Sequence, residues 1–207
     1  MKINRLKLFT DEAFYFEMTN LDVWKQHIEN IILIEENNSK FNLDTEPEEE
    51  CNVKASRTAW NSHNIYPVIN DLCEEIKKIL NKFIVEEGYD IPLLHTDECW
   101  INWYTKNQHA VPHSHKPFLA VVFFVDVEES SADFLFHSSK NFVLSKIKDN
   151  KVLKTNTLKK INVKNGTVVF FDGAIPHSVS SNLSDKRRIT VAMNLRPQYA
   201  LKRNEYK

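Results

Sequence analysis

From Trp100 onward the chain is a succession of short segments rich in Val, Ile, Phe and Tyr, the residue types that favour β-strands. No stretch of helical periodicity separates these segments. Parallel strands need such a crossover, so the pattern argues against a βαβ sheet and predicts an all-β sandwich or barrel. The segments are CWINWYTK (99–106), FLAVVFFVDV (118–127), ADFLFHS (132–138), NFVLSKI (141–147), INVKNGTVVFFDG (161–173) and RRITVAMNL (187–195).

Upstream of these strands, two stretches have the period of an amphipathic helix. Residues 19–38 predict a helix with Asn20 as its N-terminal cap, and residues 66–88 predict a second helix that ends at Gly88. We expect these helices to pack as a layer on the β core. Their apolar positions are Leu21, Trp24, His27, Ile28, Ile31, Ile32 and Ile34 in the first, and Val68, Leu72, Ile76, Ile79, Leu80 and Phe83 in the second.

Charge and cysteine content limit the partners and the compartment. The formal net charge of the 207 residues is −1, so no global charge favours nucleic acid or an anionic membrane, and we expect neither as a partner. The three scattered cysteines, Cys51, Cys73 and Cys99, are typical of reduced thiols in a cytoplasmic protein. The first 20 residues lack the apolar core of a signal peptide, and no apolar run reaches membrane-spanning length.

Two segments are locally charged. The acidic segment LDTEPEEEC (43–51) contains a proline and predicts an exposed loop. Residues 138–164 hold eight lysines and one aspartate. This basic segment predicts a solvated hairpin with lysines on an exposed edge; recruitment of an acidic substrate or nucleic acid is the alternative.

The segment QHAVPHSHKPF (108–118) holds three of the chain's eight histidines. Side chains two residues apart on a strand share one face, about 7 Å apart along the chain. If a strand begins just after Pro112, His113 and His115 project together and can converge on one ion. His109 lies beyond the proline, where we expect the ladder to be broken, so it need not share that face.

A further histidine follows a buried-looking strand. NGTVVFFDGAIPHSV (165–179) runs from a turn through an apolar strand into a loop that presents His177. His113, His115 and His177 would supply three ligands and leave coordination positions open, which is the layout of a catalytic metal site rather than a closed structural one.

The strand RRITVAMN begins with Arg187 and Arg188. A guanidinium is seldom buried without a partner, and its planar fork can grip a carboxylate at two points. An arginine that enters an apolar barrel soon after a metal-binding histidine suits a dicarboxylate cosubstrate. Alternation along a strand allows only one of the two to face inward, and the residues alone leave a surface arginine pair as the alternative.

These motifs, in this order, resemble the 2-oxoglutarate/Fe(II)-dependent oxygenases, and most closely the 2OG-Fe(II) oxygenase family common in phages and marine bacteria. The resemblance covers about residues 55–195. It rests on SRTAWNSHNIYPVINDLCEEIKKIL, WINWY, HSHKPFLAVVFFV, DFLFHSS, NGTVVFFDGAIPHSV and RRITVAMN. It implies a double-stranded β-helix (jelly roll) in a single domain, residues 1–207, with residues 1–95 as a helical N-terminal layer and residues 96–200 as the core. It also implies an oxidoreductase, in the cytoplasm of a bacterium or of a phage-infected host cell, that uses Fe(II), 2-oxoglutarate and O₂, most simply for hydroxylation.

Carried over residue by residue, the resemblance implies that His113 and His177 are the proximal and distal iron ligands. His115 stands where most of the superfamily has Asp or Glu, so the third ligand is an imidazole, with Asp172 as the alternative carboxylate. Arg188 matches the arginine that pairs with the distal carboxylate of 2-oxoglutarate, with Arg187 as the alternative. Asn102 and Tyr104 share a strand face and are candidates to hydrogen-bond the cosubstrate, against ordinary strand packing.

Other functions remain open at this point. One is a cupin-like three-histidine metalloenzyme without 2-oxoglutarate, although Leu119 and Ala120 stand where cupins typically have Glu. A three-histidine zinc hydratase would have no use for Arg188. A non-catalytic jelly-roll binding module would have surface histidines and no metal. The substrate and the oligomeric state cannot be predicted from the sequence.

Overall fold

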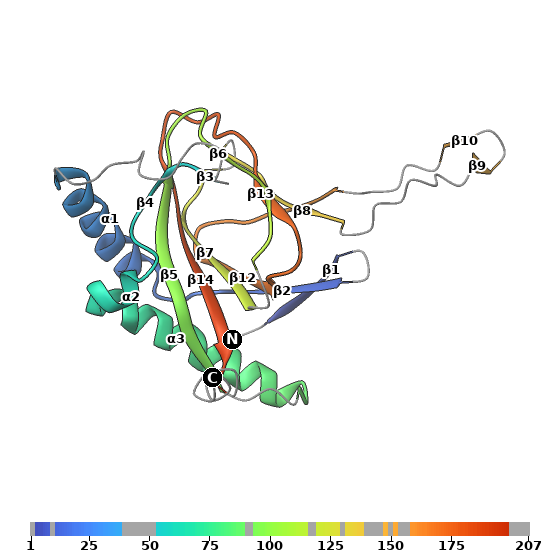
Figure 1. Cartoon of the computed structure of the whole chain (residues 1–207), viewed down its shortest axis with the longest axis horizontal. Coiled ribbons are helices and arrows are strands. Elements are labelled where there is room, and N and C mark those ends of the chain that lie inside the picture. Colours follow the sequence, from blue (N-terminus) through green and yellow to red (C-terminus); the bar gives the residue numbers. More distant parts are fainter. Residues whose placement is uncertain are drawn as a thin grey trace, which may run out of the picture.

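A large antiparallel sheet forms the centre of the molecule, with helices over one face and a second, smaller sheet over the other (Figure 1). The computed structural model describes residues 3–8, 11–38, 53–89, 93–115, 119–128, 131–138, 147–148, 151–152 and 158–198.

Within these ranges the large sheet has the strand order β1-β2-β12-β7-β14-β5-β4, with every neighbouring pair antiparallel. Its longest pairing is β5–β14, which runs from Arg188 opposite Tyr104 to Pro197 opposite Leu94, with one bulge. The strands are β1 Asn4–Leu8, β2 Asp11–Glu17, β4 Ser56–Arg57, β5 Leu94–Tyr104, β7 Leu119–Asp126, β12 Thr167–Asp172 and β14 Arg188–Pro197.

The smaller sheet has the order β11-β8-β13-β6-β3 among the described strands. A separate short pair joins β9 (Ile147–Lys148) to β10 (Lys151–Val152). The predicted jelly roll with N-terminal helices is confirmed. The strands of the smaller sheet are β3 Val53–Lys54, β6 His109–His113, β8 Phe134–His137, β11 Leu158–Ile161 and β13 His177–Val179.

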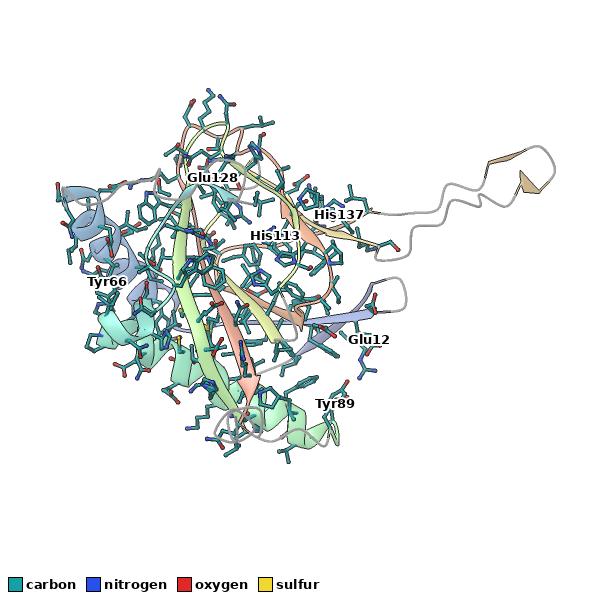
Figure 2. The ribbon with its side chains drawn as sticks, in the orientation of Figure 1. Glu12, Tyr66, Tyr89, His113, Glu128 and His137 are labelled. Atoms are coloured by element: carbon teal, nitrogen blue, oxygen red, sulfur yellow. The ribbon has the colours of Figure 1, made fainter. Side chains whose placement is uncertain are left out.

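Strand alternation gives the large sheet two different buried faces. On β5, Cys99, Ile101 and Trp103 belong to the apolar cluster shared with the helices, whereas Tyr104 belongs to the cluster between the sheets. β7 and β12 divide their side chains in the same way. Figure 2 shows Tyr66 among the helices and His113 on the side of the large sheet that faces the smaller one. Both faces therefore exclude water, and a polar group on the inner face has to find a partner there.

The helical layer is α1 (Leu21–Asn37), α2 (Ser62–Ile65) and α3 (Pro67–Glu86). α3 ends as predicted, because Gly88 has a φ of +75°, the left-handed conformation that glycine adopts at helix C-termini. In α1 the buried residues are Trp24, Ile28, Ile31 and Ile32. His27 and Ile34, which were predicted for the same face, are exposed.

The N-terminal cap of α1 differs from the prediction. The Asn20 side chain makes no capping hydrogen bond and instead donates from Nδ2 to Glu75 Oε2 of α3, at 3.2 Å. This residue therefore ties the two long helices together. None of the helices in the described ranges is long and apolar enough to cross a membrane.

The N-terminal layer is not purely helical, contrary to the expectation for residues 1–95. β1 and β2 form a hairpin that extends the large sheet, and β2 pairs along β12 from Glu17 opposite Thr167 to Ala13 opposite Phe171. The pairing buries Ala13 and Phe16 completely. The physical reason is that β12, apolar on both faces, needs a second hydrogen-bonded neighbour, and the sequence pattern of this hairpin was not recognised.

The two charged segments are largely beyond the described ranges. Residues 43–51 lie wholly outside them, as does most of the stretch 138–164. The described end of the basic stretch includes β11, which is the edge strand of the smaller sheet and exposes Lys159 and Lys160.

Candidate active site

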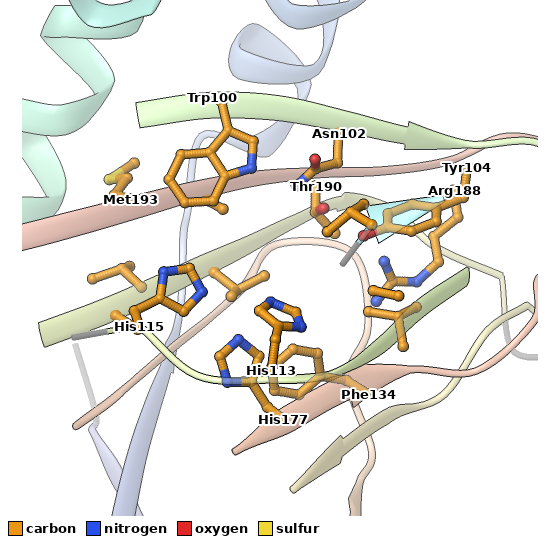
Figure 3. Close-up of a pocket in the computed structure, with 17 residues that line it drawn as sticks. Trp100, Asn102, Tyr104, His113, His115, Phe134, His177, Arg188, Thr190 and Met193 are labelled. Atoms are coloured by element: carbon orange, nitrogen blue, oxygen red, sulfur yellow. The ribbon is translucent and has the colours of Figure 1, made fainter. Parts of the chain in front are cut away.

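A cavity of about 40 Å³ lies between the two sheets. Figure 3 shows three histidines at one end of it and Arg188 at the other, with Trp100, Asn102 and Tyr104 of β5 along one wall. Apart from His115, which lies beyond the end of β6, the side chains come from β3, β5, β6, β7, β8, β13 and β14, so both sheets contribute to the cavity.

His113, His115 and His177 form one cluster. One ring nitrogen from each lies within 4.8 Å of the others. The ring centroids are 4.5 Å apart for His113 and His177, 5.1 Å for His115 and His177, and 5.4 Å for His113 and His115. Nitrogens this close can converge on a single ion.

The backbone brings the cluster together in a way that differs from the prediction. The strand does not begin after Pro112: β6 runs from His109 to His113 and contains the proline, so His113 is its last residue and His115 lies beyond it. His113 pairs with His177 across the sheet, and a bulge follows before Ala110 pairs with Val179. The irregular ladder accommodates Pro112, which has no N–H to donate.

His115 lies two residues beyond the end of β6. Its backbone N–H donates to the carbonyl of Gly173, in the turn after β12, at 2.7 Å. The two histidines of His-x-His therefore converge because a strand end and the following backbone meet the β12–β13 turn, and not because they share a pleat.

Hydrogen bonds select the free nitrogen of two of the rings. His113 Nδ1 lies 2.8 Å from the carbonyl oxygen of Val111, and His177 Nδ1 lies 2.9 Å from that of Ile175. A carbonyl only accepts, so Nδ1–H is the donor in both. This tautomer leaves the Nε2 lone pair of each ring available for a metal.

The surroundings of the three histidines lower their pKa values and so favour the neutral imidazole. Burial lowers the pKa of His113 and lowers that of His177 well below the usual value. Burial and the neighbouring His113 imidazole lower the pKa of His115 to about 4. Only neutral imidazole has a lone pair to donate, so all three side chains are ready to bind a cation near neutral pH.

Two nearby candidates stand apart from the cluster. His109 lies on β6 with its Nδ1 3.4 Å from Asn107 O and is not in the cluster. Asp172 is exposed, and its Oδ1 accepts the backbone N–H of Ala174 at 2.9 Å, which closes the turn after β12. Among the residues that the structure describes, the cluster therefore consists of imidazoles without a carboxylate.

Arg188 is buried and forms no ion pair with the residues that the structure describes. Its side chain is 1% exposed, and its Nε, Nη1 and Nη2 atoms have no hydrogen-bond partner in the described part of the chain. Its guanidinium carbon lies 5.3 Å from the ring centres of both Tyr104 and Phe124. Burial lowers the pKa of Arg188, but an arginine remains charged in proteins. A buried fork of free donors needs an anion.

The neighbouring Arg187 points the other way. It lies near the surface, where its Nη1 forms an ion pair with Glu36 Oε1 of α1 at 2.8 Å. The structure thus brings Arg188, and not Arg187, into the cavity with the histidines.

Asn102 and Tyr104 line the same cavity near Arg188 (Figure 3). The Asn102 side chain is buried, and its Oδ1 accepts no hydrogen bond within the described ranges. Thr190 also lines this end, two residues beyond Arg188 on the same strand face. Thr190 was not among the predicted site residues, although it lies two positions from Arg188 and therefore on the same face of the strand.

Trp100 and Asn194 were quoted in sequence motifs but given no role at the site. The Trp100 ring stacks on that of His115, with centroids 5.9 Å apart and planes 16° from parallel. Asn194 is buried and interacts with His115. Each residue is an even number of positions from another cavity-lining residue on its strand, so strand alternation in the sequence could have placed both on the inner face.

The donor set fits a divalent transition metal beside an anionic organic ligand. Three neutral imidazoles suit such a metal and leave coordination positions for other ligands. The unpartnered guanidinium of Arg188 lies in the same cavity. A ligand that carries a carboxylate at one end and metal-binding oxygens at the other would match both halves.

Residues 98–194 match the protein family described as Putative 2OG-Fe(II) oxygenase. No curated protein sequence matches significantly. The fold is similar to that of a prolyl-4-hydroxylase from Pseudomonas putida, with a TM-score of 0.61 and 10% identity over 91% of this chain and 94% of that one.

It is also similar to HygX from Streptomyces hygroscopicus with nickel and 2-oxoglutarate bound, with a TM-score of 0.60 and 14% identity over 92% of this chain and 84% of that one. The viral collagen prolyl hydroxylase vCPH from Paramecium Bursaria Chlorella virus-1 gives a TM-score of 0.55 and 14% identity over 88% and 96% of the two chains. At these identities the likeness concerns the fold.

Proposed function

We propose that the chain is a 2-oxoglutarate-dependent dioxygenase whose iron ligands are His113, His115 and His177, because residues 98–194 match the family described as Putative 2OG-Fe(II) oxygenase. The observation that carries the proposal is that one cavity is lined by three clustered imidazoles and by a buried arginine with no hydrogen-bond partner among the described residues.

The three histidines would hold Fe(II) through their free nitrogens. When bound, the iron supplies the chemistry in which O₂ oxidatively decarboxylates 2-oxoglutarate to succinate and CO₂ and a C–H bond of the substrate is oxidised. The chain's own share is to keep the three imidazoles neutral and oriented. Their low pKa values and the carbonyl bonds of His113 and His177 support this role.

Arg188 would pair with the carboxylate of 2-oxoglutarate that lies far from the metal. Its fork can donate two parallel hydrogen bonds, and the apolar surroundings strengthen this interaction. Asn102 and Tyr104 would donate further hydrogen bonds to the same end of the cosubstrate. Their burial on the inner face of β5 beside Arg188 supports this assignment.

Aromatic walls would keep water from the reacting groups. Phe134 and Phe171 pack on the His177 ring, with centroid distances of 5.7 Å and 4.9 Å. Trp100 covers His115. A site closed in this way protects a strong oxidant from side reactions with solvent.

The test is an anaerobic titration of the Fe(II)-loaded protein with 2-oxoglutarate, followed by its charge-transfer absorption, together with an assay of succinate release in air. Arg188→Lys keeps the charge but loses the two-point grip, so we expect binding to weaken by about 1.5–3 kcal/mol, the scale of a charged hydrogen bond. Arg188→Met should weaken it further while iron content stays near that of the wild type.

Arg187→Met is the matched control, because its side chain lies at the surface against Glu36. Titration of the wild type without any 2-oxoglutarate binding would overturn the proposal. Iron binding without 2-oxoglutarate binding would favour a cupin-like three-histidine enzyme instead, and a wild type without metal would favour a binding module.

The substrate, which would be a small molecule or a macromolecule, stays open. We place the enzyme in the cytoplasm of a bacterium or of a phage-infected host cell. The free, buried thiols of Cys73 and Cys99 support this location.

A further inference from the structure

His115 is anchored differently from its two companions. The rings of His113 and His177 are each tied by Nδ1 to the carbonyl two residues earlier in the chain. No corresponding carbonyl bond from the His115 ring occurs within the described ranges. The ring lies beyond its strand, so some other group has to orient it if it is to ligate a metal.

Asn194 is the polar side chain positioned to do so. It lies on β14 opposite Glu98 of β5 and is 3% exposed. Its Nδ2 donates to Glu98 Oε2 at 2.6 Å. Because a carboxylate only accepts hydrogen bonds, this contact fixes the orientation of the amide and turns Oδ1 away from Glu98.

The Asn194 carbonyl oxygen is therefore left for an N–H donor. Oδ1 is buried and has no hydrogen-bond partner among the described residues. On β14, Asn194 lies two residues from Ala192 on the same face, and Ala192 pairs with Trp100, whose ring stacks on His115. The unpaired oxygen therefore lies on the side of the sheet that carries the His115 ring, and the two side chains interact.

Trp100 restricts the same ring from another direction. It stacks on His115 nearly in parallel, and the Trp60 ring packs edge-on against Trp100 at 4.4 Å (Figure 3 shows Trp100 over His115). The stack limits tilting of the His115 ring, so the ring nitrogens keep their directions relative to Asn194 and to the other two histidines.

We propose that Asn194 is a positioning residue for His115: it accepts the N–H of the ring nitrogen that does not ligate, and the Glu98 carboxylate holds and polarises it from behind. This rests on the proposed function, in which His115 is a metal ligand. The chain Glu98–Asn194–His115 makes the imidazole more basic. A carboxylate two hydrogen bonds from the metal would thus supply part of the negative charge that a carboxylate ligand would bring directly.

The test uses Co(II) as the probe, because it reports affinity by titration and gives hyperfine-shifted imidazole N–H resonances in NMR spectra. The wild type should show three such exchangeable resonances. Asn194→Leu should lower the Co(II) affinity about 10- to 100-fold, the range for lost outer-sphere partners, and should remove or broaden one N–H resonance while two remain.

A double variant that exchanges the amide and the carboxylate separates the hydrogen bonds from the packing of residue 194. In Asn194→Asp combined with Glu98→Gln, the new aspartate can accept the N–H of His115 and a hydrogen bond from the new glutamine. This variant should therefore restore both the Co(II) affinity and the third resonance. Asn20→Leu is the control, since Asn20 also donates from Nδ2 to a glutamate, Glu75 Oε2, but between α1 and α3 and away from the cavity. It should bind Co(II) as the wild type does.

Two results can be told apart. If the wild type binds Co(II) with three imidazole resonances and Asn194→Leu does the same, or if the double variant fails to restore binding to a folded protein, the role of Asn194 is overturned while the proposed function stands. If the wild type itself binds neither Co(II) nor Fe(II), the proposed function fails.

Discussion

At the level of single residues, the site is defined by which imidazoles the backbone brings together. His109, His113 and His115 are close in sequence, yet only the last two join His177. We predict that His115→Leu loses most of the bound iron, because two ligands remain. His115→Asp should retain iron, because it supplies a ligand atom from the same position. Elemental analysis of anaerobically purified variants measures both.

His109→Ala is the matched control and should keep the iron of the wild type, since its ring lies by Asn107 outside the cluster. Wild-type iron content in the His115→Leu variant would mean that the third ligand is another residue, with Asp172 first to be tested.

Burial of the histidines also sets the pH range over which the site works. Unperturbed imidazoles would begin to release metal below about pH 6.5. The pKa of His115 is lowered to about 4, and those of His113 and His177 are also lowered. Protons therefore compete for the ligands only at lower pH, and we expect metal to be retained well below pH 6.5. Dialysis at stepped pH with metal analysis checks this.

The same shifts link the stability of the metal-free protein to pH. The unfolded chain binds protons at these histidines near pH 6.5, whereas the folded chain resists them until about pH 4 at His115. The free energy of unfolding should be unaffected by these groups above pH 6.5 and should fall as the pH drops from there toward 4. Urea unfolding measures this free energy. A value that does not change between pH 6.5 and pH 4 would contradict the lowered pKa values of the buried histidines.

At the level of elements, the connection between β13 and β14 determines where Arg188 enters the cavity. Asn182, fully buried, donates from Nδ2 to the carbonyls of Tyr104 and Lys186 at 3.0 Å each, and its Oδ1 accepts the N–H of Ser184 at 3.2 Å. Asn182→Ala leaves buried carbonyls unpaired, so the free energy of unfolding should fall by on the order of 3 kcal/mol.

Chemical denaturation measures this effect. Asn37→Ala is the control: its Nδ2 donates to Leu33 O on an exposed helix surface, and its loss should change the free energy by about 0.5 kcal/mol or less. Equal effects of the two substitutions would mean that the β13–β14 connection is not held by Asn182.

The β core could be predicted from the sequence because its strands are short apolar runs rich in Val, Ile, Phe and Tyr. Alternate residues of these runs pack into two different apolar clusters, one on each face of the large sheet. The same alternation limits the inward position to one of Arg187 and Arg188. The convergence of His115 could not be predicted correctly, because it depends on a backbone contact with Gly173 that joins residues 58 positions apart in the chain. The β1–β2 hairpin was missed because its place depends on the open edge of β12, a long-range pairing that local periodicity does not encode.

At the level of the whole molecule, the helices, the hairpin and the jelly roll share one large sheet. β2 pairs with β12, while Ile28, Leu72 and Ile101 belong to one apolar cluster. We therefore predict that the chain is a single domain with one cooperative unfolding transition. Tryptophan fluorescence and far-ultraviolet circular dichroism should give the same midpoint in urea; Trp24→Phe, which removes a reporter in α1, should leave the two signals coincident. An early transition in one signal would indicate a separately folding N-terminal layer.

If Arg188 binds 2-oxoglutarate as proposed, the lifetime of the protein should depend on the concentration of that metabolite. A fold that buries a guanidinium without a counter-ion is least stable when empty, and a dicarboxylate that binds only the folded state adds about 2.7 kcal/mol at a hundred times its dissociation constant. We expect proteolysis of the native protein to slow in proportion as 2-oxoglutarate rises, and Arg188→Met to abolish that response. Cells short of the oxo acid would then hold less of the enzyme as well as a slower one, so that supply of a single metabolite would set both the amount and the rate.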